Sequence, residues 1–189
     1  MVKIATHDSG TGEESKNLLH RLFEPFAKTQ TKTIEEQVKS GVRYFDLRIN
    51  KDYIICHGLW KSNKNLFDIL SDLEYYAVKL NVNIYYTITV ERNFKDIDCF
   101  IEQLTNIRFN YHKIQCICIN RKRPKWECVH SFIKIPIKAD YVSVPTPEQY
   151  LKFKFKNWRS YIPIPKVLHS MYNRRYKFNE DYFVMVDFF

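Results

Sequence analysis

The sequence predicts an α/β fold, a reduced or distorted TIM-type (β/α) barrel forming a single domain over residues 1–189. Segments with strand-like and helix-like hydrophobic periodicity alternate along the chain, which is typical of parallel βα units. No glycine-rich phosphate turn follows any expected strand, so an open doubly wound sheet is the second choice. The chain is shorter than the ~250 residues of a typical complete barrel, so some helices must be short or absent.

The amino-terminal part begins the alternation of strands and helices. Apolar residues at helical spacing predict its first helix, which Pro25 bends or ends. A capping box from Thr33 to Glu36 opens the second helix, and Gly41 ends it. The expected elements are, in order, a strand over 2–6, helices over 13–27 and 33–41, and strands over 42–49 and 53–56.

The rest of the chain continues the same pattern. Leucine, isoleucine and aromatic residues repeat on one helical face in two long segments, and β-branched residues dominate the runs between them. The expected elements are a helix over 64–80, a strand over 84–90, a helix over 94–108, and strands within 114–119, 133–144 and 183–188.

The composition is that of a soluble globular protein, with 45% hydrophobic and 27% charged residues. The net charge is +9, and all of it arises in residues 111–189, which hold 15 Lys and Arg against 6 acidic residues. Such an excess attracts an anionic surface, either phospholipid or nucleic acid, or it forms a solvated face. No nucleic-acid recognition motif is present, so we expect no nucleic-acid partner.

The cysteines and the hydropathy profile indicate the state of the thiols and where in the cell the protein is expected to lie. Five cysteines without a CxxC pair predict free, mostly buried thiols and no zinc site. No apolar run reaches the ~20 residues of a membrane span, so we expect no transmembrane segment. The first residues lack the apolar core of a signal peptide, which favours a cytoplasmic or peripheral membrane location and leaves secretion open. We expect a monomer.

Polar residues with catalytic chemistry follow the first three expected strands. His7 and Asp8 follow the first, Asp46 and Arg48 lie in the second, and His57 follows the third. Strand carboxyl ends converge on one face of a (β/α) barrel, where active sites are built. Two imidazoles can then act as base and acid in phosphoryl chemistry, and a guanidinium can bind the phosphate oxygens. On the residues alone, a structural role for both histidines is an equally good interpretation.

Three ordered blocks of this sequence resemble a known family. Residues 7–11, 30–49 and 57–58 together are similar to the X-domain of phosphatidylinositol-specific phospholipases C, and most similar to its bacterial form. The clear resemblance covers residues 2–60, and residues 184–188 resemble the last barrel strand of the family. The resemblance implies cleavage of phosphatidylinositol to diacylglycerol and a cyclic inositol phosphate, at an anionic membrane surface.

The resemblance also implies roles for single residues. His7 corresponds to the general base that activates the inositol 2-hydroxyl, and Asp187 to the carboxylate that orients it. His57 corresponds to the general acid for the diacylglycerol oxygen, with Asp8 as its partner. Arg48 corresponds to the arginine that contacts the phosphate.

Three further residues are predicted to bind substrate. Asp46 matches the acidic residue two positions before the phosphate-binding arginine. Glu91 stands where bacterial relatives have lysine, which makes it a departure from the family pattern, and Arg121 is a candidate headgroup ligand. Arg48 takes a position that holds a calcium ligand in eukaryotic relatives, and its charge replaces that of the ion. We therefore expect no metal and no cofactor.

Other functions compete with this hypothesis. One is a catalytically reduced domain of the same family that binds phospholipid headgroups or an acidic partner. A nucleic-acid-binding or nucleic-acid-cleaving protein is suggested by charge alone. A glycerophosphodiester phosphodiesterase would normally need acidic metal-binding pairs, one of whose positions is taken by Arg48.

Overall fold

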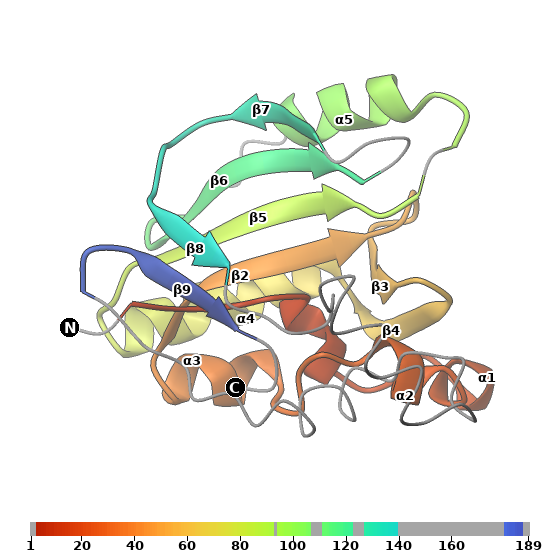
Figure 1. Ribbon diagram of the computed structural model, residues 1–189, viewed down its shortest axis with the longest axis horizontal. Helices are drawn as coiled ribbons and strands as arrows, with labels where there is room; N and C mark the ends of the chain where they lie inside the picture. The colour runs from red at the N-terminus through yellow and green to blue at the C-terminus, as the bar shows by residue number, and fades with distance from the viewer. Residues whose placement is uncertain (1–2, 93, 107–110, 123–126, 140–179, 187–189) are drawn as a thin grey trace, which may run out of the picture.

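A parallel β-sheet forms the centre of the structure, a computed structural model that describes residues 3–92, 94–106, 111–122, 127–139 and 180–186 (Figure 1). The strands are β1 (Ile4–Thr6), β2 (Val42–Ile49), β3 (Ile54–His57), β4 (Trp60–Asn65), β5 (Ile84–Val90), β6 (Ile114–Arg121), β7 (Glu127–Ser131), β8 (Ile137–Ala139) and β9 (Phe183–Val186). The α-helices are α1 (Leu18–Arg21), α2 (Glu24–Ala27), α3 (Ile34–Lys39), α4 (Leu66–Lys79) and α5 (Ile97–Asn106), and η1 (Ser9–Gly12) is a 3₁₀ helix.

The strand order is β7-β6-β5-β2-β1-β9-β8, and six neighbouring strands from β6 to β8 run parallel. Strand β7 is antiparallel to β6 at one edge, and the β3–β4 hairpin extends from β2. Within the described residues the outermost strands β7 and β8 do not pair with each other, so the sheet does not close. The prediction of an α/β fold with a distorted barrel is confirmed.

Helix α4 shows how the sequence builds the core. Asn65 caps its first turn by accepting from the backbone N–H groups of Phe67 and Asp68, and the Asp68 carboxylate accepts from the Asn65 N–H. The helix then buries five apolar side chains in the main core cluster: Leu66, Ile69, Leu70, Leu73 and Ala77. Each fully buried leucine of this kind contributes about 1.5–3 kcal/mol to stability.

The predicted helix over 13–27 is wrong. Asn17 accepts a hydrogen bond from the His20 N–H and starts a single turn, α1, at Leu18. Pro25 has no N–H to donate and stands in the first turn of a second short helix, α2. The apolar residues that suggested one long amphipathic helix therefore lie largely outside the core, with Leu18, Leu19 and Leu22 all at least 60% exposed.

The other element boundaries differ from the prediction more modestly. Strands β4 and β7 were not expected from the sequence, and helix α4 starts two residues later than predicted. Strand β8 confirms only a part of the strand-rich segment 133–144, because residues 133–136 are not in a strand. Residues 107–108, 140–144 and 187–188 of the predicted elements lie outside the described residues.

Candidate active site

The predicted catalytic side chains gather where the parallel strands end. His7 and Asp8 follow β1, Arg48 lies near the end of β2, and Glu91 follows β5. His57 is the last residue of β3, in the hairpin at the same edge (Figure 1). The parallel register pairs Arg48 with Thr89, so that β2 and β5 present their last residues side by side. This arrangement confirms that the carboxyl ends of the strands converge on one cluster.

The carboxylate of Asp8 is shared between both histidines and the arginine. Its Oδ2 lies 3.6 Å from His7 Nδ1 and 3.4 Å from His57 Nδ1, and its Oδ1 forms an ion pair with Arg48 Nε. Asp8 is buried and has a left-handed backbone conformation with a φ of 47°, which Asp tolerates better than most residues. One carboxylate thus orients three charged or titratable groups.

The charge of Asp8 is strongly stabilised by its neighbours. Burial is the largest single influence and would raise the pKa of this carboxyl. Electrostatic interactions with Arg48, His57, His7 and Lys122 together outweigh burial and lower the pKa of Asp8 from 3.8 to about 2. Asp8 is therefore ionised at neutral pH.

Arg48 is a buried cation at the centre of the cluster. Its Nη2 lies 2.6 Å from His7 Nε2, and its Nε lies 3.3 Å from Asp46 Oδ2. Burial alone would lower the pKa of Arg48, but the carboxylates of Asp8, Asp46 and Glu91 outweigh it and raise that pKa. The guanidinium therefore keeps its charge and its donors.

Asp46 is held by the scaffold around it. Its Oδ1 accepts hydrogen bonds from the hydroxyls of Thr87 and Thr89 on β5, at 3.4 and 3.3 Å. Its Oδ2 accepts from the backbone N–H of Asp8 at 3.3 Å, as well as from Arg48. Asp46 thereby ties β2 to β5 and to the turn after β1.

The His57 ring is fixed through one nitrogen and leaves the other available. Its Nδ1 lies 2.7 Å from the backbone oxygen of Ala27, at the end of α2. A carbonyl oxygen can only accept, so Nδ1 carries the proton in this contact. The side chain of His57 is 20% exposed. Its Nε2 is therefore the atom suited to transfer a proton to a bound molecule.

Buried amide side chains hold the backbone of His7 in place. The Gln30 Nε2 group donates to the backbone oxygens of both His7 and Val186, at 3.0 and 2.9 Å, and so joins β1 to β9. The Gln37 side chain accepts from Thr6 and donates to the backbone oxygen of Ser9. These contacts fix the turn that presents His7 and Asp8.

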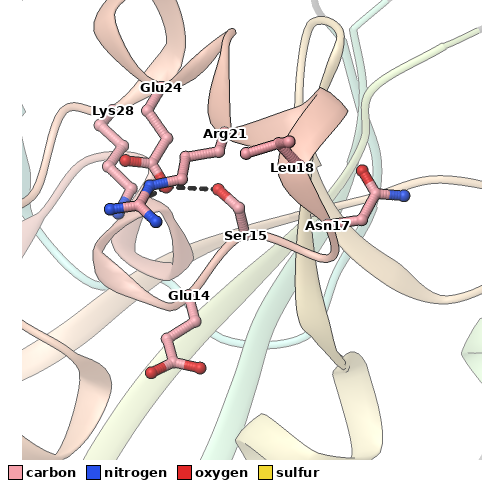
Figure 2. Close-up of a pocket in the computed structure, with 7 residues that line it drawn as sticks. All are labelled: Glu14, Ser15, Asn17, Leu18, Arg21, Glu24 and Lys28. Carbon is pink, nitrogen blue, oxygen red and sulfur yellow. Dashed lines mark hydrogen bonds and ion pairs between the residues drawn. The ribbon is translucent and has the colours of Figure 1, made fainter.

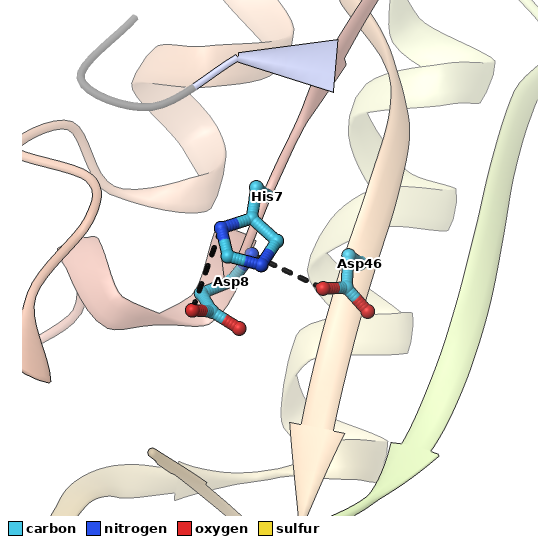
Figure 3. Close-up of side chains that lie close together, drawn as sticks. All are labelled: His7, Asp8 and Asp46. Atoms are coloured by element: carbon cyan, nitrogen blue, oxygen red, sulfur yellow. Dashed lines mark hydrogen bonds and ion pairs between the residues drawn. The ribbon is translucent and has the colours of Figure 1, made fainter. Parts of the chain in front are cut away.

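Three side chains of the cluster could in principle hold a metal ion. Ligand atoms of His7, Asp8 and Asp46 lie within 4.8 Å of one another, and Figure 3 shows the His7 ring beside both carboxylates. Arg48 contacts all three of these residues. Its fixed positive charge disfavours a cation at the same place.

The remaining predicted residues divide into three groups. Glu91 lies inside the cluster, with its Oε2 3.6 Å from Arg48 Nη1. Arg121 instead forms an ion pair with Asp98 of α5, with Nη1 2.9 Å from Oδ1. Asp187 lies outside the described residues. The sequence interpretation missed Lys122, whose Nζ lies 2.6 Å from Glu91 Oε1; its position directly after β6 was the available signal.

No protein-family model matches the chain. The 1-phosphatidylinositol phosphodiesterase of Listeria monocytogenes is 31% identical to it over 108 residues, which are 56% of this chain and 33% of the relative. The matched region therefore spans about a third of the length of that relative.

Two solved structures share the fold of the chain. The phosphatidylinositol-specific phospholipase C from Listeria monocytogenes has a TM-score of 0.62 at 17% identity, covering 99% of this chain and 88% of that one. A mutant of the phosphatidylinositol-specific phospholipase C from Staphylococcus aureus has a TM-score of 0.58 at 16% identity, covering 98% and 85%. The chain thus has the distorted-barrel fold of these bacterial phospholipases C.

Proposed function

We propose that this chain is a metal-independent phosphoric diester hydrolase and lyase of the phosphatidylinositol-specific phospholipase C family. It cleaves phosphatidylinositol-type phospholipids to diacylglycerol and a cyclic inositol phosphate. Three ordered sequence blocks, a curated relative at 31% identity and the shared fold support the family. The site geometry supports the chemistry.

One observation carries the proposal: a single carboxylate orients both imidazoles around a buried guanidinium. Asp8 Oδ2 lies within 3.6 Å of Nδ1 of both His7 and His57, and Asp8 Oδ1 pairs with Arg48. Both rings then direct their Nε2 atoms away from Asp8. A base and an acid on either side of a phosphate-binding cation are the groups that a phosphodiester cleavage needs.

In the proposed step one proton passes from the substrate to the protein and another passes from the protein to the leaving group. His7 Nε2 takes the proton of the inositol 2-hydroxyl while that oxygen forms a bond to phosphorus. The bond from phosphorus to the glycerol oxygen breaks, and His57 Nε2 gives its proton to the leaving oxygen. Arg48 turns its donors from His7 to the non-bridging oxygens, where negative charge develops. Asp187 is proposed to orient His7, and Asp46 and Arg121 to contribute to substrate binding.

A membrane surface is the proposed partner. None of the helices in the described part of the chain has the length and apolar character to cross a bilayer. An apolar surface, here called the α1–α2 surface, instead exposes Leu18, Leu19, Leu22, Phe26 and Leu59, each between 41% and 76% exposed. Leu59 lies in the turn between β3 and β4, and its backbone oxygen lies 3.1 Å from the Nδ1 of His20 on α1, so this turn and the two helices are linked. The backbone oxygen of Ala27, at the end of α2, contacts His57.

Charged residues border the α1–α2 surface. A neighbouring pocket is lined by Glu14, Ser15, Asn17, Leu18, Arg21, Glu24 and Lys28, and Figure 2 shows Arg21 and Lys28 on the same side of it. These charges are of both signs, and Lys28 Nζ lies 3.5 Å from Glu24 Oε1, so the affinity of this surface for a bilayer would rest mainly on its exposed leucines. Such a surface at the mouth of the site would let a lipid headgroup reach His57 without leaving the membrane.

The deciding experiment is turnover of phosphatidylinositol vesicles in the presence of a chelator. We expect the wild-type protein to release diacylglycerol and a cyclic inositol phosphate, identified by phosphorus NMR as a cyclic diester. A domain that only binds headgroups would associate with the vesicles and release neither product. Hydrolysis of glycerophosphodiesters with no cyclic product would also contradict the proposal.

A further inference from the structure

The two residues that follow β5, Glu91 and Arg92, hold the turn next to His57. Glu91 Oε1 accepts a hydrogen bond from the Gly58 N–H at 3.2 Å, and Arg92 Nη2 donates to the Gly58 oxygen at 2.5 Å. Gly58 directly follows His57 and has a φ of +60°, a conformation that glycine adopts most readily. Neighbouring residues of one strand end thus fix the polar groups on both sides of Gly58.

Glu91 also reaches the other half of the site. It is buried, and its Oε2 lies 3.6 Å from Arg48 Nη1. Its Oε1 lies 2.6 Å from Lys122 Nζ, so two cations balance its charge. The Glu91 carboxylate therefore contacts two parts of the site: the turn after His57, the proposed general acid, and Arg48, the proposed phosphate-binding residue.

The His57 turn depends on such contacts because of its place in the fold. The β3–β4 hairpin pairs with the central sheet where Ile55 of β3 lies opposite Ile49 of β2. Ile55 is two residues before His57. His57 pairs with Trp60 at the tip of the hairpin, beyond the sheet. The body of the hairpin is held by other contacts, because Trp60 is fully buried and its Nε1 donates to Ser15 Oγ at 2.7 Å. The His57 ring itself is held by Ala27 and Asp8, and the turn after it by the Gly58 contacts.

We propose that Glu91, assisted by Arg92, is a positioning residue that holds the general acid His57 against the leaving oxygen. The inference rests on the proposed function and gives Glu91 a role that requires no contact with substrate. Protonation by a general acid matters when the leaving group is a basic alkoxide, as in diacylglycerol. It matters little for an aryl leaving group, which departs as a stable phenolate. Misplacement of His57 should therefore be visible as a change in leaving-group preference.

The catalytic test compares two substrates, phosphatidylinositol and a nitrophenyl ester of inositol phosphate. We expect Glu91→Ala to lower the ratio of kcat/KM for phosphatidylinositol to that for the aryl ester about tenfold. Glu91→Gln keeps an acceptor for the Gly58 N–H and should keep the ratio within about threefold of wild type. Glu102→Ala, at an exposed position of α5, is the matched control and should leave the ratio unchanged.

A second test measures the stability of the turn directly and does not depend on enzymatic activity. The chain has four glycines, and Gly58 is the one that follows a histidine. Labelling histidine carbonyls with ¹³C and glycine amides with ¹⁵N therefore isolates the Gly58 amide in a single NMR correlation. We expect its hydrogen exchange to be at least tenfold faster in Glu91→Ala than in wild type and close to wild type in Glu91→Gln. If Glu91→Ala does not fold, Glu91→Asp gives the same test, because the shorter side chain withdraws the acceptor from the Gly58 N–H.

The two tests together decide the inference. Faster exchange with a lowered substrate ratio supports it. An unchanged Gly58 amide overturns it, and so does an equal loss on both substrates, which would place Glu91 in phosphate binding or stability. A wild-type protein inactive on both substrates would contradict the proposed function and the catalytic half of the inference. The amide would still show whether Glu91 holds the turn.

Discussion

His7 Nε2 lies 2.6 Å from Arg48 Nη2 in the buried cluster. A guanidinium nitrogen can only donate, so this contact requires a lone pair on Nε2 and places the proton of the neutral ring on Nδ1, toward Asp8. That is the tautomer that a general base needs. The same contact means that a bound phosphate must draw Arg48 away from His7, which would expose the base as substrate binds.

Replacing either His7 or His57 with alanine should abolish most turnover. Each ring transfers one of the two protons, and loss of a general acid or base costs about 10²–10⁴-fold in rate. The measurement is initial release of cyclic inositol phosphate, with circular dichroism to confirm folding. His112→Ala, at an exposed position two residues before β6, should retain full activity. A His7→Ala variant within threefold of wild type would refute the assignment.

Chelators should leave the activity of the wild-type protein unchanged. Arg48 contacts every residue of the possible metal cluster and supplies a fixed charge there. Arg48→Met should lower kcat about 10²-fold or more, because the non-bridging phosphate oxygens lose the hydrogen-bond donors that stabilise their charge in the transition state. The assay compares rates with chelator and with added calcium for both proteins. Loss of wild-type activity in chelator, restored by calcium, would reveal a metal site.

The ionisation of Asp8 should make stability fall in acid. Because its pKa is about 2 in the folded protein and 3.8 ordinarily, the carboxylate contributes about 2 kcal/mol that is present above pH 3.8. That contribution is lost as the pH falls through 3.8 toward 2. Denaturant unfolding at pH 5 and pH 2 should show this loss in wild type and a correspondingly smaller one in Asp8→Asn. Equal pH dependence in both proteins would be incompatible with an ionised, paired Asp8.

The convergence of the site could be predicted because it follows from strand direction. Parallel pairing brings together the ends of β1, β2 and β5, which belong to different segments of the chain. His57 arrives differently, on a hairpin strand that pairs antiparallel with β2. The sharing of Asp8 between His7 and His57 could not be predicted. It depends on the left-handed backbone at Asp8 and on the position of a hairpin tip, which no periodicity encodes.

The errors in the sequence interpretation also have physical causes. Spacing of Leu18, Leu19 and Leu22 predicted a buried helical face, because periodicity reports a common side and does not say whether that side is covered. The partner of Glu91 was missed because Lys122 lies 31 residues away and on another strand. A buried carboxylate needs a cation, but the sequence does not state which lysine of the many will supply it.

Apolar contact should add to charge in holding the protein on anionic vesicles. Sequence predicts attraction through residues 111–189, although Lys152, Lys154 and Lys156 lie outside the described residues. Binding should therefore weaken with salt, because charges are screened beyond roughly 8 Å at physiological ionic strength. At high salt the α1–α2 surface should still retain a part of the binding.

Removing the exposed leucines separates these two contributions. A Leu18→Ser/Leu22→Ser variant should bind anionic vesicles about tenfold more weakly, because a fully buried leucine contributes about 1.5–3 kcal/mol and these would be partly inserted. Leu80→Ser is the matched control, since Leu80 is exposed at the end of α4, shortly before β5 begins, whereas the active-site cluster follows the end of β5. Cosedimentation at low and high salt is the measurement, and turnover of a water-soluble aryl ester should stay unchanged in all three proteins. If the leucine variant bound as tightly as wild type, the α1–α2 surface would not be the membrane contact, and the basic residues alone would have to account for binding.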